Sequence, residues 1–197
     1  MTEFWITGIG RTATKWLAAC MDWPHEPKDP APQMVSPAHL HRLAFNHWTP
    51  PPEMRVAIIV RDAHAQMRSV LSRLRAKRSL IDEVSLVRRH AIYRQTLDQL
   101  MAGGAGVMRY EVMTRNLGHL TRELEQAGMP PPKGFLLEPL NVHAARPEFA
   151  TLPPWAERIA QANQEHYDRW LRDRGMRSFT ADEFSGTTTS SRPKSQP

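Results

Sequence analysis

The chain has 197 residues, 41% of them hydrophobic, which is enough for one sizeable core, and we expect a single domain over residues 1–184. Its single cysteine, Cys20, excludes an intramolecular disulfide, and no apolar stretch is long enough to cross a bilayer. We therefore expect a soluble cytoplasmic protein with no membrane partner, and the formal charge of +6 favours an anionic ligand.

Short apolar runs alternate with helical repeats along the chain. Runs rich in β-branched or aromatic residues predict strands at 4–7, 55–60, 106–110 and 134–137. Apolar residues at helical spacing predict helices within 67–74, 80–101, 117–127 and 153–171. This alternation predicts an α/β fold of three layers, α/β/α, with a central parallel sheet of four to five strands. In such sheets, ligands bind beyond the carboxyl ends of the strands.

Two segments interrupt this alternation. Residues 24–53 hold eight prolines and four histidines, and we interpret them as a long surface excursion with at most one short helix. Residues 185–197 have no apolar anchor and are expected to be a disordered tail. No cysteine or spaced carboxylate pattern accompanies the histidines of the excursion, so we expect no metal site there.

The turn after the first predicted strand has the features of an anion site. It reads Gly8-Ile9-Gly10-Arg11-Thr12-Ala13-Thr14-Lys15 and leads into a helix. Free amides and the positive dipole end of a helix hold an anion there, and hydroxyl and cationic side chains strengthen the binding. A triphosphate loop would place Ser or Thr after the lysine to hold magnesium, whereas this chain has Trp16.

The turn after the strand at 55–60 is the second candidate. Arg61 follows the strand, Asp62 is suited to cap the next helix, and Ser69 lies within that helix. These residues have two interpretations. They are either an anion site, or a structural ion pair between Arg61 and Asp62 with Ser69 as a solvated helix residue.

Together, the two turns resemble those of the sulfotransferases that use 3′-phosphoadenosine 5′-phosphosulfate (PAPS). Residues 11–17, Arg-Thr-Ala-Thr-Lys-Trp-Leu, line up with the family's basic-Ser-Gly-Thr-Thr-Trp-Leu loop, and Arg61 and Ser69 have the spacing of its Arg-Asp-Pro signature and later serine. Arg109-Tyr110-Glu111 is similar to its Tyr-Glu-Asp segment. The chain departs from the family where Ala13 replaces a glycine, Lys15 a threonine and Ala63 a proline.

The resemblance implies a P-loop-like fold, PAPS as donor, adenosine 3′,5′-bisphosphate (PAP) as product, and no metal. It implies that the 5′-phosphosulfate is held by Arg11, Thr12, Ala13, Thr14 and Lys15. It also implies that Trp16 lies near the adenine, and that Arg61 and Ser69 hold the 3′-phosphate. The acceptor would be a small molecule with a hydroxyl or amine group, whose identity the sequence does not indicate.

Catalysis would need charge stabilisation and a base. Arg11 and Lys15 are the candidates for stabilising the charge on the transferred group, because sulfuryl transfer resembles phosphoryl transfer in its in-line geometry. His25 or Glu26, beyond the first helix, is the candidate base by the same resemblance. The alternative that both are ordinary loop residues stays open, because one sequence gives no distances.

Three other functions would fit parts of the sequence. A P-loop nucleotide or small-molecule kinase would share the sheet topology, and a catalytically inactive relative would share the ligand. A basic nucleic-acid-binding module would use the cations around the helix that contains Ser69: Arg68, Arg73, Arg75, Lys77, Arg78, Arg88 and Arg89. No nucleic-acid-reading signature accompanies these cations, and cations at a helix C-terminus also complement its dipole. The sequence does not indicate an oligomeric state.

Overall fold

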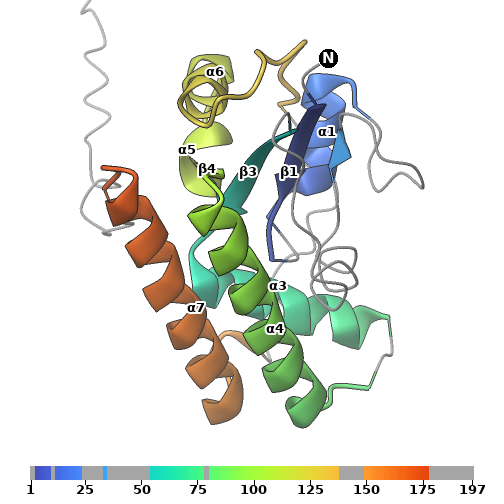
Figure 1. Cartoon of the computed structure of the whole chain (residues 1–197). Helices are drawn as coiled ribbons and strands as arrows, with labels where there is room; N and C mark the ends of the chain where they lie inside the picture. The colour runs from blue at the N-terminus through green and yellow to red at the C-terminus, as the bar shows by residue number, and fades with distance from the viewer. Residues whose placement is uncertain are drawn as a thin grey trace, which may run out of the picture.

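The structure is a computed structural model and describes residues 3–9, 12–23, 33–34, 54–77, 80–137 and 149–177. Strands and helices alternate along most of the chain (Figure 1). The elements are β1 (Glu3–Thr7), α1 (Thr14–Met21), β2 (Gln33–Met34), β3 (Met54–Val60), α3 (Ala63–Ala76), α4 (Glu83–Ala102), β4 (Gly106–Arg109), α5 (Tyr110–Met113), α6 (Leu117–Gln126) and α7 (Pro154–Asp173).

The strands form a parallel sheet in the order β2-β1-β3-β4. Trp5 of β1 lies opposite Val56 of β3, and Ile59 of β3 lies opposite Met108 of β4. The predicted α/β class with a parallel sheet is confirmed. Three strands lie where the sequence predicts them, and the two-residue β2 adds a short pairing beside β1.

Alternation along the central strands divides the core into two clusters. Ile6, Ala57 and Ile59 face α1 and α6, while Val56 and Ile58 face the cluster that α3, α4 and α7 complete. Side chains of a strand point to opposite faces in turn, so a strand covered by helices on both sides must be apolar at every position. Ala57 through Val60 are accordingly 0% exposed.

Local signals explain where the helices begin and end. The Asp62 carboxylate accepts a hydrogen bond from the Ala65 amide at 2.6 Å and caps α3, and Asn116 caps α6 in the same way through the His119 amide. α7 begins at a proline, which lacks the amide that would be unpaired there. Gly128 follows α6 with a φ of 72°, a conformation that glycine adopts at little cost.

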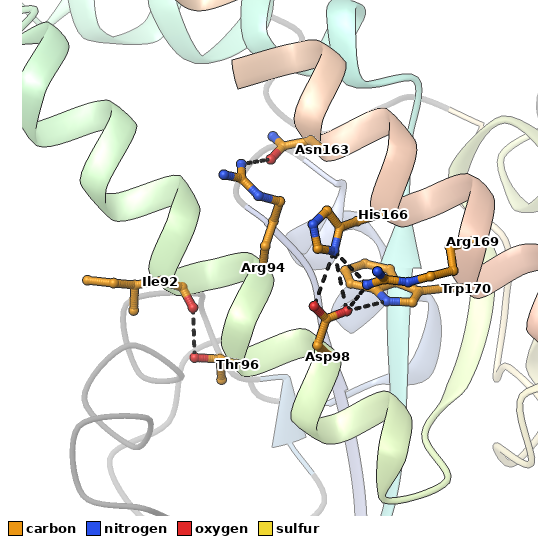
Figure 2. A network of polar contacts seen from close by, with 8 residues as sticks. All are labelled: Ile92, Arg94, Thr96, Asp98, Asn163, His166, Arg169 and Trp170. Carbon is orange, nitrogen blue, oxygen red and sulfur yellow. Dashed lines mark hydrogen bonds and ion pairs between the residues drawn. The ribbon is translucent and has the colours of Figure 1, made fainter. Parts of the chain in front are cut away.

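α7 runs beside α4, and a polar network joins the two helices (Figure 2). The Asp98 carboxylate accepts hydrogen bonds from Trp170 Nε1 at 2.8 Å and from Arg169, and it pairs with His166. One turn earlier on α4, Arg94 donates to Asn163 Oδ1 at 2.8 Å. These contacts hold α7 against α4.

The prediction of a strand at 134–137 is wrong. This segment is a loop packed on the C-terminal end of α1, where the amides of Lys133 and Gly134 both donate to the Cys20 carbonyl oxygen. The indole Nε1 of Trp16 donates to the carbonyl oxygen of Leu136 at 3.0 Å. Because its polar backbone groups pair with a helix, the segment does not join the sheet.

The expected excursion at 24–53 contains β2, which the sequence analysis missed because two residues carry no periodicity. The rest of that excursion and the expected tail at 185–197 lie outside the described residues. Within the described ranges, every helix is too short or too polar to cross a membrane.

Candidate functional site

The strand order places a topological switch point between two neighbouring strands. From β1 the chain moves to β2 on one side, and then returns to β3 on the other side of β1. The connections therefore leave the carboxyl ends of β1 and β3 in opposite directions, which is the switch point where open parallel sheets bind ligands. Both turns singled out in the sequence start there, one after Thr7 and one after Val60.

Gly8 allows the first turn to pack closely against β3. A Cβ atom added at Gly8 would lie 2.5 Å from Thr12 Oγ1 and 2.8 Å from the carbonyl oxygen of Ile59. Neither distance is compatible with a side chain, so only glycine fits at this position. The sequence alone did not distinguish Gly8 from the other residues of this turn.

Ala13 holds a left-handed conformation at the start of α1. It is the N-cap residue, with φ 59° and ψ 25°, and its methyl side chain cannot accept the hydrogen bond that caps a helix. A non-glycine residue in this region is strained by about 1 kcal/mol or more. A glycine at this position would relieve that strain. Unlike Asp62 of α3 and Asn116 of α6, Ala13 has no polar side-chain atom with which to cap its helix.

The threonines of the first turn are buried. Thr7 and Thr12 are each 1% exposed, and within the described residues the hydroxyls of both lack a hydrogen-bond partner. A buried hydroxyl without a partner costs about 1–3 kcal/mol. An anionic oxygen is a partner that Thr12 can take. Lys15 is exposed on the first turn of α1.

Trp16 is a core residue in this structure. Its side chain is 4% exposed, its Nε1 bonds to Leu136, and its ring meets the ring of Phe135 edge-on with centroids 5.5 Å apart. These contacts account for a tryptophan here through packing alone. The contact of Trp16 with an adenine stays a prediction.

The second turn presents Arg61 on an aromatic ring. The Cζ atom of the guanidinium lies 4.4 Å from the centroid of the Tyr110 ring, and the residue is half-buried. Asp62 uses its carboxylate to cap α3. Ser69 is 8% exposed, so it is not the solvated residue of the alternative interpretation.

Residues from α5 and α7 support the second turn. The amide of Asp62 donates to Glu111 Oε1 at 2.9 Å, and the amide of Ala63 donates to Gln164 Oε1 at 3.0 Å. Burial raises the pKa of the Glu111 carboxyl. The neighbouring Arg109 makes a different contact, an ion pair with the buried Glu123 at 2.7 Å, so it acts in packing α6 on β4.

A buried glutamine connects the two turns. Gln66 of α3 is 0% exposed, and its Nε2 donates to the Ile9 carbonyl oxygen at 2.6 Å. Its Oε1 accepts from the hydroxyl of Tyr167 in α7 at 2.9 Å, and burial raises the pKa of that hydroxyl. This link was not predicted from the sequence, where its signal was a glutamine at a position at which the helical repeat calls for an apolar residue.

Three predicted site residues, Arg11, His25 and Glu26, lie outside the described residues. Among those that are described, Thr12, Ala13, Thr14 and Lys15 follow β1, and Arg61 and Ser69 follow β3. Two hollows lie away from these turns, one of about 450 Å³ along α4 near Asp98 and one of about 260 Å³ beside α5 and α6. In the part of the chain that the structure describes, no cluster of His, Cys, Asp or Glu is suited to hold a metal.

A scan against models of protein families finds no match, and neither does a search of curated proteins or of solved structures.

Proposed function

We propose that this protein is a sulfotransferase with a P-loop-like fold, which moves a sulfuryl group from PAPS to a hydroxyl or amine acceptor. The observation that carries the proposal is the position of the two turns at the β1/β3 switch point, with Gln66 bonded to the first turn and built into the helix that follows the second. A nucleoside with a phosphate group at each end needs two anion sites a short distance apart, held at a constant separation.

Each turn would have its own part in the reaction. The N-terminus of α1, where Ala13 gives no side-chain cap, would bind the 5′ end with the Thr12 hydroxyl and the Lys15 ammonium, and Arg61 with Ser69 would bind the 3′-phosphate. In the transfer, a bond forms between the acceptor atom and sulfur while the bond from sulfur to the phosphate oxygen breaks. The acceptor proton passes to a base, for which His25 and Glu26 stay the candidates.

The absent hydroxyl after Lys15 argues against the kinase alternative. Where a triphosphate loop has a Ser or Thr for magnesium, this chain has Trp16, whose indole is 4% exposed and bonded to Leu136. A donor with single phosphate groups at separate ends does not require a metal at this position.

The direct experiment is a thermal-shift series with PAP, ATP and ADP, each with and without magnesium. At 100 times its dissociation constant a ligand stabilises the folded state by about 2.7 kcal/mol, so binding is readily seen. We expect stabilisation by PAP without magnesium, and its loss in Arg61→Ala. The control is Arg73→Ala, an exposed arginine in the last turn of α3, the helix that follows Arg61.

The competing functions predict other results. Stabilisation by ATP only with magnesium would indicate a kinase. Binding to DNA with a steep salt dependence and no response to PAP would indicate a nucleic-acid-binding module. With PAPS and an accepted substrate, Lys15→Ala should lower turnover by about 10²- to 10³-fold if the ammonium contacts the transferred group.

A further inference from the structure

An aromatic ring and a carboxylate lie beside the turn that contains Arg61. The ring of Tyr110 lies under the guanidinium, with the Cζ atom 4.4 Å from its centroid. Glu111 accepts the hydrogen bond of the Asp62 amide at 2.9 Å, and its charge attracts Arg61. Both residues belong to α5 at the end of β4, so the strand next to β3 supplies the support.

An arginine needs such support in order to bind an anion well. Its side chain has about 2 kcal/mol of rotamer entropy, part of which is lost when the guanidinium is held in one place. A ring face under the guanidinium limits its orientations before any ligand arrives, and a bonded Asp62 amide fixes the peptide from which the side chain starts. Preorganisation of this kind raises affinity without a new contact to the ligand.

Packing alone does not account for Glu111. The Oε2 atom of Glu111 is buried and lacks a partner within the described ranges, and a buried carboxylate is costly unless its charge is compensated. An apolar residue would fill the same space without that cost. A ring under the guanidinium and a carboxylate bonded to the next amide indicate a role in holding Arg61.

We infer that Tyr110 and Glu111 are positioning residues that hold the Arg61–Asp62 turn in its anion-binding geometry. The inference deepens the proposed function and rests on it for the identity of the ligand. The inference goes beyond the proposed function because it assigns positioning roles to two residues of α5, which need not touch the ligand.

The test is a double-mutant cycle on PAP affinity, measured by calorimetry. We expect Arg61→Ala to weaken binding by about 10- to 100-fold and Tyr110→Leu by about 2- to 30-fold. Because Tyr110 acts through Arg61, Tyr110→Leu should add nothing in the Arg61→Ala background. Tyr110→Phe, which keeps the ring, should bind as the wild type does, and so should the control Tyr93→Leu in α4.

If Tyr110→Leu weakens PAP binding equally in the wild type and in the Arg61→Ala variant, the inference is overturned and the proposed function stands. Should Tyr110→Leu not fold, Glu111→Gln takes its place in the cycle. Its amide oxygen still accepts from Asp62 while the charge beside Arg61 is lost, and we expect about 2- to 10-fold weaker binding that is again absent without Arg61.

A titration with inorganic sulfate distinguishes a failure of this inference from a failure of the proposed function. If the wild type does not bind PAP, the proposed function fails, and the same cycle is measured with sulfate by NMR titration. Coupling between Tyr110 and Arg61 in sulfate binding would support the positioning role on its own. A wild type that binds neither PAP nor sulfate would overturn both.

Discussion

The side chain of Gln66 donates a hydrogen bond to the carbonyl oxygen of Ile9 at 2.6 Å, which joins the helix after β3 to the turn after β1. The Tyr167 hydroxyl donates a hydrogen bond to Oε1 of the same Gln66 side chain at 2.9 Å. All three residues are at most 1% exposed, so the turn that is proposed to hold the 5′-phosphosulfate is fixed from inside the protein.

Gln66→Leu should therefore destabilise the protein and weaken PAP binding together. The substitution leaves the Ile9 carbonyl and the Tyr167 hydroxyl buried without partners, which should lower the free energy of unfolding by about 2–4 kcal/mol. Urea denaturation measures this loss. Tyr167→Phe removes one of the two bonds and should cost about half as much; equal losses in both variants would contradict the role given to the Ile9 bond.

Ala13→Gly should stabilise the protein. At φ 59°, alanine is strained and glycine is not, so we expect the free energy of unfolding to rise by about 1 kcal/mol. Ala19→Gly is the matched control, since Ala19 is exposed within the same helix and should lose about 0.5–1 kcal/mol on substitution. The two substitutions should thus change the denaturation midpoint in opposite directions.

Gly8→Ala should distort the first turn. The added methyl group would lie 2.5 Å from Thr12 Oγ1 and 2.8 Å from the Ile59 carbonyl oxygen, so the turn must move. We expect a loss of about 1–3 kcal/mol and loss of PAP binding. Gly134→Ala, where no atom lies within 4 Å of the added group, should change stability by less than about 0.5 kcal/mol. A Gly8→Ala variant with unchanged affinity would contradict the close packing.

Thr12→Val should separate stability from binding. The hydroxyl of Thr12 is buried without a partner in the described part of the chain, so an isosteric methyl group should leave stability unchanged or raise it. The same substitution removes a hydrogen bond proposed for the phosphosulfate and should weaken PAP binding by about 10-fold. Thr96→Val, which loses a bond to the Ile92 carbonyl oxygen in α4, should leave PAP affinity as it is. If PAP affinity is unchanged in Thr12→Val, Thr12 does not contact the ligand.

His90 should make the protein less stable in acid. Burial, with Arg94 nearby as a lesser cause, lowers the pKa of His90 from 6.5 to about 4, so the folded protein keeps this ring neutral. Between pH 6.5 and about pH 4, the unfolded chain binds a proton at this residue and the folded chain does not. The stability that the neutral ring contributes is therefore complete above pH 6.5 and is lost as the pH falls toward 4. The contribution is about 3 kcal/mol.

Denaturation of the wild type and of His90→Gln between pH 4 and pH 7 measures how much of the pH dependence of stability comes from His90. The variant should lose less stability than the wild type as the pH falls, because it has no ring to protonate in the unfolded chain. His119→Gln, on α6, controls for the removal of a histidine as such. Parallel pH profiles for the wild type and His90→Gln would contradict the assignment.

Local patterns in the sequence were enough to predict the α/β class, three of the strands and the four long helices. Asp62 and Asn116 cap helices at predicted starts, and Pro154 and Gly128 mark predicted boundaries. Such signals depend on residues a few positions apart in the chain, so they can be read without knowledge of the fold. The same holds for the two turns, whose glycine, threonine and cationic residues stand together in the sequence.

Only the tertiary structure decided which groups meet. The sequence contains nothing to show that the amides of Lys133 and Gly134 bond to Cys20, which is why 134–137 was predicted as a strand. Likewise, the bond of Gln66 to Ile9 and the stacking of Arg61 on Tyr110 join residues 57 and 49 positions apart. Hydrophobic periodicity determines which face of an element is buried, whereas the partner of each buried polar group depends on how the elements pack, and that packing is a property of the whole chain.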